Sequence, residues 1–397
     1  MTGVRRPRAV LLAFVCEPGG GSENGVGWLW ARAAAEFADV TVLTRADHQA
    51  AVATAAHAEG LAIDAIAVDL PRPLRGLFPR KLIFVYYVLW QLFAARTLRR
   101  LERSEPIDVV HHVTWASDSL PSALLASHAP VRVWGPVGGA TRTAAGLYRY
   151  LSPRGKLDQG VRDVVNGAIR CTAGELVARH ATLVVALNAD VERRWRRAAA
   201  PVVVEPNFAC VGLPAAVAVT TVGTDARRTA LFVGRLVPWK GLLLALRGLA
   251  RAPGWRLEVY GDGPERKRAL ALVAKLGLVG RVTFHGHVGR DQLLAAMSTA
   301  DALLFPSFHD SAPWSVGEAA SLGCPVVCLD AGGSSLLAGA NAHVVPGTPA
   351  VTLPERLGAA LEALPARGSC DISWDGQRLA RLLRGWYGQR ADVEVPA

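Results

Sequence analysis

The chain has 397 residues, too many for one ordinary hydrophobic core and about right for two domains. Hydrophobic residues make up 51% and charged residues 19%, which describes a globular protein with ample core. The formal net charge of +11 and the pI near 9.8 favour anionic partners. Nucleic acid is not expected among them, because no compact basic-aromatic motif is present.

The six cysteines show neither metal-ligand spacing nor the density of a disulfide framework. They stand at positions 16, 171, 210, 324, 328 and 370. Near the start, Arg5, Arg6 and Arg8 lead into a strand-length run at residues 9–16, and not into the apolar helix of a secretory signal. We therefore expect reduced thiols and a cytoplasmic location.

Apolar runs of strand length alternate with helical patterns along the chain. In the N-terminal half, strands are predicted at residues 9–16, 40–44, 63–68, 108–112, 131–134, 182–187 and 201–205. In the C-terminal half, they are predicted at residues 229–233, 256–260, 281–285, 302–305 and 325–329. This alternation predicts an α/β fold with parallel sheets covered on both faces.

Residues 209–228 are rich in small side chains and have no amphipathic period, so we interpret them as an interdomain linker. The predicted domains are residues 1–208 and residues 229–376. A basic amphipathic helix is predicted in the last segment, residues 377–397, over 377–389.

A glycine-rich turn, CEPGGGSENGVGWLW, follows the first predicted strand. A dinucleotide-binding fingerprint needs a third glycine, but with Gly19 and Gly21 in place, position 24 is Asn, so an NAD enzyme is not expected. Gly20 and Gly21 would let the backbone approach a ligand closely. The alternative is a plain tight turn, with Ser22 or Asn24 capping the next helix.

The apolar run LIFVYYVLWQLFAA, residues 82–95, has arginines on both sides and is too short to span a bilayer. A buried core helix is the default interpretation. The alternative is a helix with one face on a membrane surface, and the net charge favours it because anionic head groups attract arginine-rich surfaces.

His111 and His112 stand at the end of the predicted strand 108–112. Ligands of open parallel sheets bind at the carboxyl ends of the strands, so the pair predicts a ligand-facing histidine, with His112 favoured over His111. The alternative is a pair of satisfied core histidines. After the next strand, the loop WGPVGGATR carries Gly138, Gly139 and Arg142 and is a candidate wall of a binding site.

The run TALFVGRLVPWKG is an apolar strand that ends in Gly234 and is followed by Arg235 and Lys240, five residues apart. A planar guanidinium and a point-charge ammonium suit a diphosphate, and a helix starting at about Trp239 would direct N–H groups to the same place. The spacing is not that of a Walker loop. The alternative is a strand followed by a basic, solvated helix start.

The run FPSFHDSAPWSVGEAASLGCPVV separates Asp310 from Glu318 by seven residues, with a loop first and the start of a helix second. An acid early in a helix is normally a partner for the helix dipole. Beside a diphosphate site, however, loop N–H groups can bind phosphate, and carboxylates can accept hydrogen bonds from sugar hydroxyls. The two motifs together predict a nucleotide-sugar pocket.

With these motifs the chain resembles family 4 of the retaining glycosyltransferases, within the glycosyl transferases group 1, which have the GT-B architecture. The family loop Gly-Arg-x-x-x-x-Lys-Gly is matched by Gly234, Arg235, Lys240 and Gly241. Glu318 matches the second acid of the family's Glu-x7-Glu, whereas Asp310 replaces the first Glu and is one methylene shorter. The runs at 261–264 and 282–286 and the pair at 332–333 follow in family order.

The resemblance implies two Rossmann-like domains whose parallel sheets face across a cleft, with the last helix crossing back to the N-terminal domain. It also implies sugar transfer, with retention, from a nucleoside-diphosphate donor, UDP more often than GDP. The acceptor would be a hydroxyl of a glycan, a lipid-linked sugar or a small natural product. A peripheral contact with the inner face of a membrane would suit a lipid-linked acceptor.

The resemblance assigns roles to residues. Arg235 and Lys240 would neutralise the departing diphosphate, Glu318 would bind the ribose, and Asp310 and His112 would contact the donor sugar. Further donor contacts are expected from Gly20, Gly21, Gly234, Gly261, Gly286 and the backbone of Trp314, Ser315 and Val316. Acceptor-side contacts are expected from His111, Gly138, Gly139 and Arg142.

No metal or other cofactor is expected, because the sequence contains no Asp-x-Asp triplet and the two cations would do that work. Two other functions stay open. A member that binds the nucleotide sugar without transferring it would fit the shortened acid at 310, and a sugar-nucleotide epimerase can have the same architecture.

Overall fold

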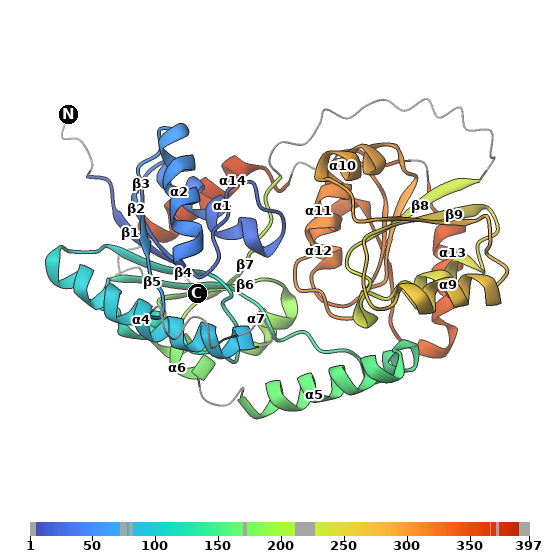
Figure 1. Cartoon of the computed structure of the whole chain (residues 1–397), viewed down its shortest axis with the longest axis horizontal. Helices are drawn as coiled ribbons and strands as arrows, with labels where there is room; N and C mark the ends of the chain where they lie inside the picture. The colour runs from blue at the N-terminus through green and yellow to red at the C-terminus, as the bar shows by residue number, and fades with distance from the viewer. Residues whose placement is uncertain are drawn as a thin grey trace. The chain divides into compact units, whose positions relative to one another are not determined.

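The computed structural model describes residues 5–71, 78, 82–169, 173–210, 227–365, 367–370 and 373–388. The chain divides into two compact units (Figure 1). The first unit is Met1–Ala140, Val165–Ala209 and Gly376–Ala397, and the second is Thr141–Val164 and Cys210–Asp375. Most of the predicted linker, residues 211–226, lies outside the described residues.

Seven parallel strands form the sheet of the first unit, in the order β3-β2-β1-β4-β5-β6-β7. They are β1 (Arg8–Ala13), β2 (Asp39–Thr44), β3 (Ile63–Ala67), β4 (Val109–Thr114), β5 (Val131–Val137), β6 (Leu183–Ala186) and β7 (Val202–Val204). The strand order reverses between β1 and β4, and at such a point the carboxyl ends of the strands form a natural binding site.

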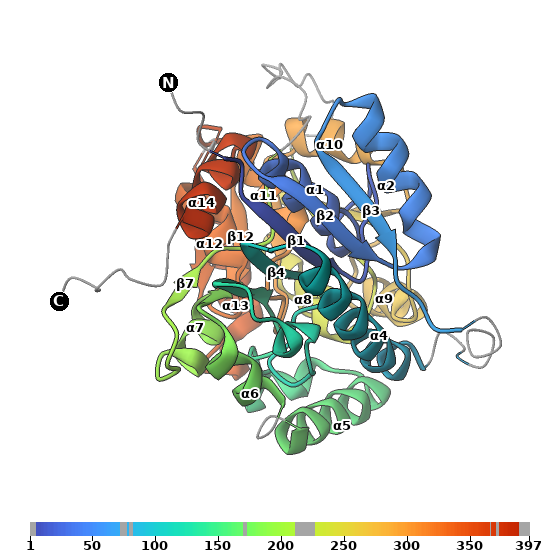
Figure 2. The ribbon, with the colours of Figure 1, turned by 90° about the vertical axis from the view of Figure 1, so that its left-hand side faces the viewer.

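Helices pack on this sheet because each has one apolar face. They are α1 (Glu23–Ala35), α2 (Ala46–Ala58), α4 (Ile83–Ser104), α6 (Ala173–His180), α7 (Ala189–Trp195) and α14 (Gly376–Gly388). Fully buried Trp90, Trp134 and Trp195 belong to the core. The last helix lies beside α1 (Figure 2), where the Trp386 and Trp30 rings are 6.1 Å apart.

Six parallel strands form the sheet of the second unit, in the order β10-β9-β8-β11-β12-β13. They are β8 (Arg228–Val233), β9 (Trp255–Tyr260), β10 (Val282–Gly286), β11 (Ala302–Phe305), β12 (Val326–Leu329) and β13 (Ala342–Val345). Its helices include α8 (Leu242–Leu249), α9 (Arg266–Lys275), α10 (Arg290–Thr299), α11 (Trp314–Ser321), α12 (Ser334–Ala338) and α13 (Leu353–Glu362). The predicted α/β fold with two parallel sheets is confirmed.

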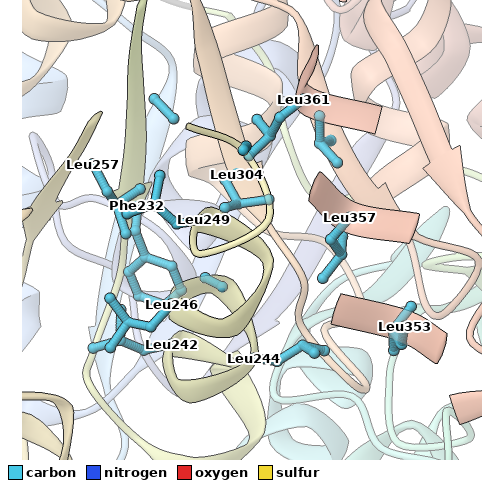
Figure 3. Close-up of a cluster of buried hydrophobic side chains, with 14 of the residues drawn as sticks. Phe232, Leu242, Leu244, Leu246, Leu249, Leu257, Leu304, Leu353, Leu357 and Leu361 are labelled. Carbon is cyan, nitrogen blue, oxygen red and sulfur yellow. The ribbon is translucent and has the colours of Figure 1, made fainter. Parts of the chain in front are cut away.

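Leucines of α8 and α13 make the core of the second unit, together with Phe232 of β8 (Figure 3). Leu242, Leu246 and Leu249 gather around Phe232, while Leu353, Leu357 and Leu361 line α13. Spacings of three and four residues put these leucines on one face of each helix, so the sequence pattern itself builds this layer.

Every predicted strand overlaps an observed one, and β13 is the strand that the prediction missed. Its four residues, AHVV, form a half-exposed edge strand and so lack a continuous apolar run. The predicted N-terminal domain of residues 1–208 also differs from the first unit, because residues 141–164 belong to the second. Leu147 and Leu151 are buried in the core of that unit, far along the chain from their partners.

Candidate functional site

The candidate diphosphate loop starts where β8 ends, at Gly234, whose φ is +143°. A Cβ on Gly261, at the end of β9, would lie 2.0 Å from the Gly234 carbonyl oxygen, so only glycine allows this approach of two strand ends. A Cβ on Gly234 would lie 3.8 Å from Lys240 Cδ and Cε. The Lys240 side chain therefore folds back over the end of β8.

The helix predicted to start at about Trp239 starts later. Pro238–Lys240 form a 3₁₀ turn, Gly241 follows with φ +80°, and α8 begins at Leu242. A Cβ on Gly241 would lie 2.2 Å from the Pro306 carbonyl oxygen. The close passage of the chain at Pro306 thus requires glycine and breaks the helix, which a local sequence pattern does not reveal.

Lys240 and Asp310, one from each predicted motif, form an ion pair. Lys240 Nζ lies 3.0 Å from Asp310 Oδ1 and 2.9 Å from Oδ2. It also lies 5.1 Å from the centre of the Phe305 ring. The Ser307 hydroxyl donates a 2.5 Å hydrogen bond to Asp310 Oδ2. Only 14% of the Lys240 side chain and 19% of the Asp310 side chain are exposed.

Burial by itself raises the pKa of the Asp310 carboxyl, but Lys240 and Ser307 outweigh it and hold that pKa below its ordinary value. Asp310 is therefore ionised at neutral pH. Removal of either member of the pair would leave a mostly buried charge without its partner.

Arg235 differs from Lys240 in exposure. Its side chain is exposed, and within the described part of the chain its guanidinium has no hydrogen-bond or ion-pair partner. The end of β8 thus carries one cation compensated by Asp310 and one that is free. An unpaired guanidinium beside an ion pair of zero net charge favours binding of an anionic ligand.

The loop after Asp310 leads into α11, which has Pro313 at its N-cap and no capping side chain. Of the three N–H groups predicted to bind phosphate, that of Val316 donates to the Pro313 carbonyl at 3.0 Å and is already used. The N–H groups of Trp314 and Ser315 lie in the first turn, where the helix dipole favours an anion.

Glu318 lies in the second turn of α11 and forms an ion pair that the sequence analysis missed. Its Oε1 accepts a 3.0 Å hydrogen bond from Arg290 Nε and lies 3.0 Å from a terminal nitrogen of the same guanidinium. Burial raises the pKa of Glu318, and Arg290 opposes that rise. Arg290 is the first residue of α10. It follows the glycine turn after β10, in GHVGRDQ, and this position in the sequence could have indicated a site residue.

The glycines of the second unit that were predicted to contact a donor lie at neighbouring strand ends. Gly234 follows β8, Gly261 follows β9, and Gly286 ends β10. The Gly261 N–H donates to the Gly286 carbonyl at 2.7 Å, and this hydrogen bond connects the ends of β9 and β10. The structure thus brings together the predicted glycines of the second unit.

His309, next to Asp310, is a further residue that was not predicted. Its ring stacks on Trp239, with centres 5.5 Å apart, and its Nε2 accepts a 2.8 Å hydrogen bond from Arg162 of α5 (Pro153–Ile169). Burial and the Arg162 charge lower the pKa of His309 to about 4, so the ring is neutral and can accept that bond. His309 therefore ties both site loops to the 141–164 segment.

In the first unit, the glycine-rich turn closes on itself. The Glu17 N–H donates to the Asn24 carbonyl and the Gly20 N–H donates to the Glu17 carbonyl, both at 3.0 Å. Ser22 takes the N-cap position of α1 with φ +55°, and its side chain makes no capping bond. Around Gly21, an added Cβ would meet nothing within 4 Å. Besides these backbone bonds, the Asn24 side-chain amide donates to Glu17 Oε2 at 3.0 Å, so Asn24 braces the turn and neither it nor Ser22 caps the helix.

The two histidines lie within β4, which continues to Thr114, and not at its end. His111 is 0% exposed, and its ring nitrogens lie 2.8 Å from the Tyr387 hydroxyl and 2.7 Å from the Gly135 carbonyl. His112 is 1% exposed, and its Nδ1 lies 2.8 Å from the Ser122 hydroxyl.

Burial lowers the pKa of His111 to about 3 and that of His112 to about 4, so both rings are neutral at pH 7. Neighbours within the first unit occupy these rings, because the strand is longer than predicted and keeps both rings inside the core. This corrects the predicted placement at the strand end and favours the alternative of satisfied core histidines, while the donor-sugar and acceptor contacts of His111 and His112 stay predictions.

The end of β4 instead carries Trp115, with φ +59°, an uncommon conformation for a bulky residue. Its N–H donates to Glu23 Oε1 at 3.2 Å, and Asn207 donates to Glu23 Oε2 at 3.2 Å. Burial raises the pKa of Glu23. These groups are the polar contacts at the carboxyl ends of the first sheet, and no sequence pattern pointed to them.

Gly138, Gly139 and Arg142 do not form one wall within a unit. The Gly138 N–H donates to the Ala116 carbonyl at 2.9 Å, and a Cβ on Gly139 would lie 2.4 Å from Asp118 Oδ1, so both glycines pack on the chain that follows β4. Arg142 belongs to the second unit and is exposed.

The described residues contain neither a metal cluster nor a membrane-spanning helix. No group of three or more His, Cys, Asp and Glu side chains is placed to hold a metal ion. No helix in the same residues has the length and apolar character needed to cross a membrane.

Comparisons with known proteins find similarity to glycosyltransferases. Residues 223–355 match the model described as glycosyl transferases group 1. D-inositol 3-phosphate glycosyltransferase of Mycolicibacterium smegmatis is 27% identical over 417 residues, covering 94% of this chain and 89% of that protein. 2-deoxystreptamine glucosyltransferase of Streptomyces kanamyceticus is 37% identical over 106 residues, only 26% of this chain and 27% of that relative.

Solved structures share the fold at low sequence identity. Sucrose-phosphate synthase from Thermosynechococcus elongatus has a TM-score of 0.60 at 18% identity, covering 96% of this chain and 98% of its own. The lipopolysaccharide outer core galactosyltransferase WaaB has a TM-score of 0.59 at 14% identity, covering 96% of each chain. Anabaena HepE in complex with UDP has a TM-score of 0.55 at 18% identity, covering 95% of this chain and 98% of its own.

Proposed function

We propose that this chain, whose residues 223–355 match the glycosyl transferases group 1 and whose fold is GT-B, is a retaining enzyme that uses a nucleoside-diphosphate sugar. The proposed nucleotide is UDP in preference to GDP. The proposed acceptor is a hydroxyl of a glycan, a lipid-linked sugar or a small natural product. The relatives support transfer to a small acceptor, since two are named for D-inositol 3-phosphate and 2-deoxystreptamine.

One observation carries this proposal: the end of β8 gathers Lys240, its partner Asp310 and the free Arg235. In the proposed reaction the sugar–phosphate bond breaks, and negative charge grows on the diphosphate. Arg235 is exposed and without a partner, so it can meet that charge directly. Lys240 can share its protons between Asp310 and a phosphate oxygen, since an ammonium has three donors.

Asp310 has a second proposed task. Its carboxylate is ionised and held by Lys240 and Ser307, so its remaining lone pairs can accept hydrogen bonds from donor-sugar hydroxyls. Glu318 is proposed to accept from the ribose through the oxygen that Arg290 leaves unused. The departing phosphate is the proposed proton acceptor in a same-face attack, so no protein nucleophile and no metal ion are required.

A thermal-shift panel of nucleoside diphosphates tests the nucleotide assignment. UDP should raise the unfolding temperature more than GDP or ADP, since a ligand at 100 times its Kd adds about 2.7 kcal/mol to stability. Arg235→Ala should unfold at the wild-type temperature without ligand and lose most of the UDP shift. An unchanged UDP shift in Arg235→Ala would contradict the diphosphate assignment.

A product assay separates transfer from the two other functions. Incubation with a UDP-sugar and a hydroxyl acceptor should give a glycoside with the donor's anomeric configuration, in the presence of EDTA. An epimerised donor without acceptor would indicate an epimerase. Binding of UDP without turnover across a panel of donors and acceptors would indicate a binding-only member.

A further inference from the structure

Helix α4 has one buried and one exposed face. Tyr87, Trp90, Gln91, Ala94 and Leu98 pack into the first unit. The opposite face carries Val85, Leu92, Arg96, Arg99 and Arg103, whose spacings of seven, four, three and four residues place them in one stripe along the helix.

The N-terminal half of this stripe is apolar. Val85 is 49% exposed and Leu92 is 54% exposed, and Phe84, beside the stripe, is 62% exposed. A cluster of large apolar side chains on the surface is unfavourable in water. Such a cluster therefore marks an interaction site more often than a single exposed leucine does.

The C-terminal half of the stripe is cationic and borders an open cavity of about 570 Å³. The cavity is lined by Arg99, Arg103 and His128, with Glu102 beside them. Glu102 is already engaged, because it accepts hydrogen bonds from the Ser127 hydroxyl at 2.6 Å and the His128 N–H at 3.1 Å. Neither Arg99 nor Arg103 has a hydrogen-bond or ion-pair partner within the residues that the structure describes.

We propose that the exposed face of α4 binds the surface of an anionic lipid bilayer. Phe84, Val85 and Leu92 enter the interface between head groups and acyl chains, while Arg99 and Arg103 hold a head-group phosphate in the cavity. A soluble phosphate would satisfy the guanidinium groups but would leave the apolar half in water. A bilayer surface satisfies both halves at once, and the formal net charge of +11 strengthens the attraction.

Sedimentation with vesicles tests the proposal on the full chain. In 150 mM salt, we expect binding to vesicles of phosphatidylcholine with 30% phosphatidylglycerol to be at least ten times stronger than to phosphatidylcholine alone. The double variant Phe84→Ser, Leu92→Ser should lose binding about tenfold or more. The double variant Arg99→Gln, Arg103→Gln should lose the preference for the anionic lipid.

Matched controls lie in the second unit. Val279 is 76% exposed, so Val279→Ser removes an isolated apolar side chain. Arg149→Gln with Arg154→Gln removes two charges from exposed positions. Both controls should bind vesicles like the wild type, and circular dichroism should show that all variants are folded.

Three outcomes would overturn the proposal. The wild type could fail to sediment with anionic vesicles, or the α4 variants could bind as well as the controls. Inorganic phosphate at millimolar concentration could abolish binding in the wild type while the apolar double variant binds normally, which would make the cavity a free-phosphate site.

Discussion

Two pairs of polar residues near parallel strands differ in burial and in charge. Lys240 and Asp310 lie in loops beyond the ends of β8 and β11, remain partly exposed and are both charged. His111 and His112 lie inside β4, are fully buried and are neutral. A polar residue within a central strand is enclosed by the helices on both faces of the sheet. A polar residue in the loop beyond the strand can keep contact with water and stay ionised.

Where a strand ends therefore decides whether a polar side chain of this protein lies inside the core or in a partly exposed loop. The four experiments below test that difference, from the largest expected effect to the smallest.

The cations after β8 should matter most. Arg235→Ala and Lys240→Ala should each lower turnover by roughly two to three powers of ten, as expected for loss of one preorganised donor to a growing charge. Only Lys240→Ala should also lower the free energy of unfolding, by about 1–3 kcal/mol, because it leaves Asp310 without its partner. Steady-state kinetics and urea unfolding measure both, with Arg149→Ala as the control at an exposed arginine. Near-normal rates in both site variants would disprove the assignment.

Asp310→Asn should lower turnover by about one to two powers of ten, since it removes a charged acceptor worth about 1.5–3 kcal/mol. Asp310→Glu should weaken binding of the native donor, because the longer side chain pushes the carboxylate about one bond further into the pocket. In the wild type, the stability that the lowered pKa of Asp310 provides is present at neutral pH and lost as pH falls through that pKa. Equal kcat and KM for the wild type and Asp310→Asn would remove Asp310 from the site.

Arg290→Gln should raise the KM for the donor about tenfold and change kcat little, because Glu318 loses the cation that orients its carboxylate. The pKa of Glu318 should rise further, since burial is then opposed by no charge from Arg290. The KM for the 2′-deoxyribose analogue divided by the KM for the UDP-sugar should fall towards one, and Arg290→Lys should restore part of this ratio. An unchanged ratio would show that the pair is structural.

His112→Gln should leave turnover at pH 7.5 within about twofold of the wild type. Its effect should lie in stability. The pKa of His112 is lowered to about 4, so at pH values between this pKa and that of the unfolded chain, only the unfolded chain binds a proton at His112. Wild-type stability should therefore fall between about pH 6.5 and 4, and the variant should show a shallower fall. Urea unfolding at several pH values measures this, and a large loss of turnover with normal stability would return His112 to the site.

Much of the fold and part of the site could be predicted from the sequence. Apolar runs and their spacing are local properties, so they located the strands that flank Gly234, Asp310 and the other motifs. The glycine, cation and acid spacings also predicted groups that the second unit brings together, and its role as the donor side stays a prediction. The prediction missed the edge strand β13 because a strand of four residues with one buried side chain carries too little hydrophobic pattern.

Only the tertiary structure decided which charges meet. Lys240 and Asp310 are 70 residues apart and pair because β8 and β11 are neighbours in the sheet, and Arg290 reaches Glu318 because α10 precedes β11 and packs near α11. It also decided that β4 encloses His111 and His112, and that one face of α4 remains outside the core. Each of these depends on which elements pack side by side, a property that no local stretch of the sequence contains.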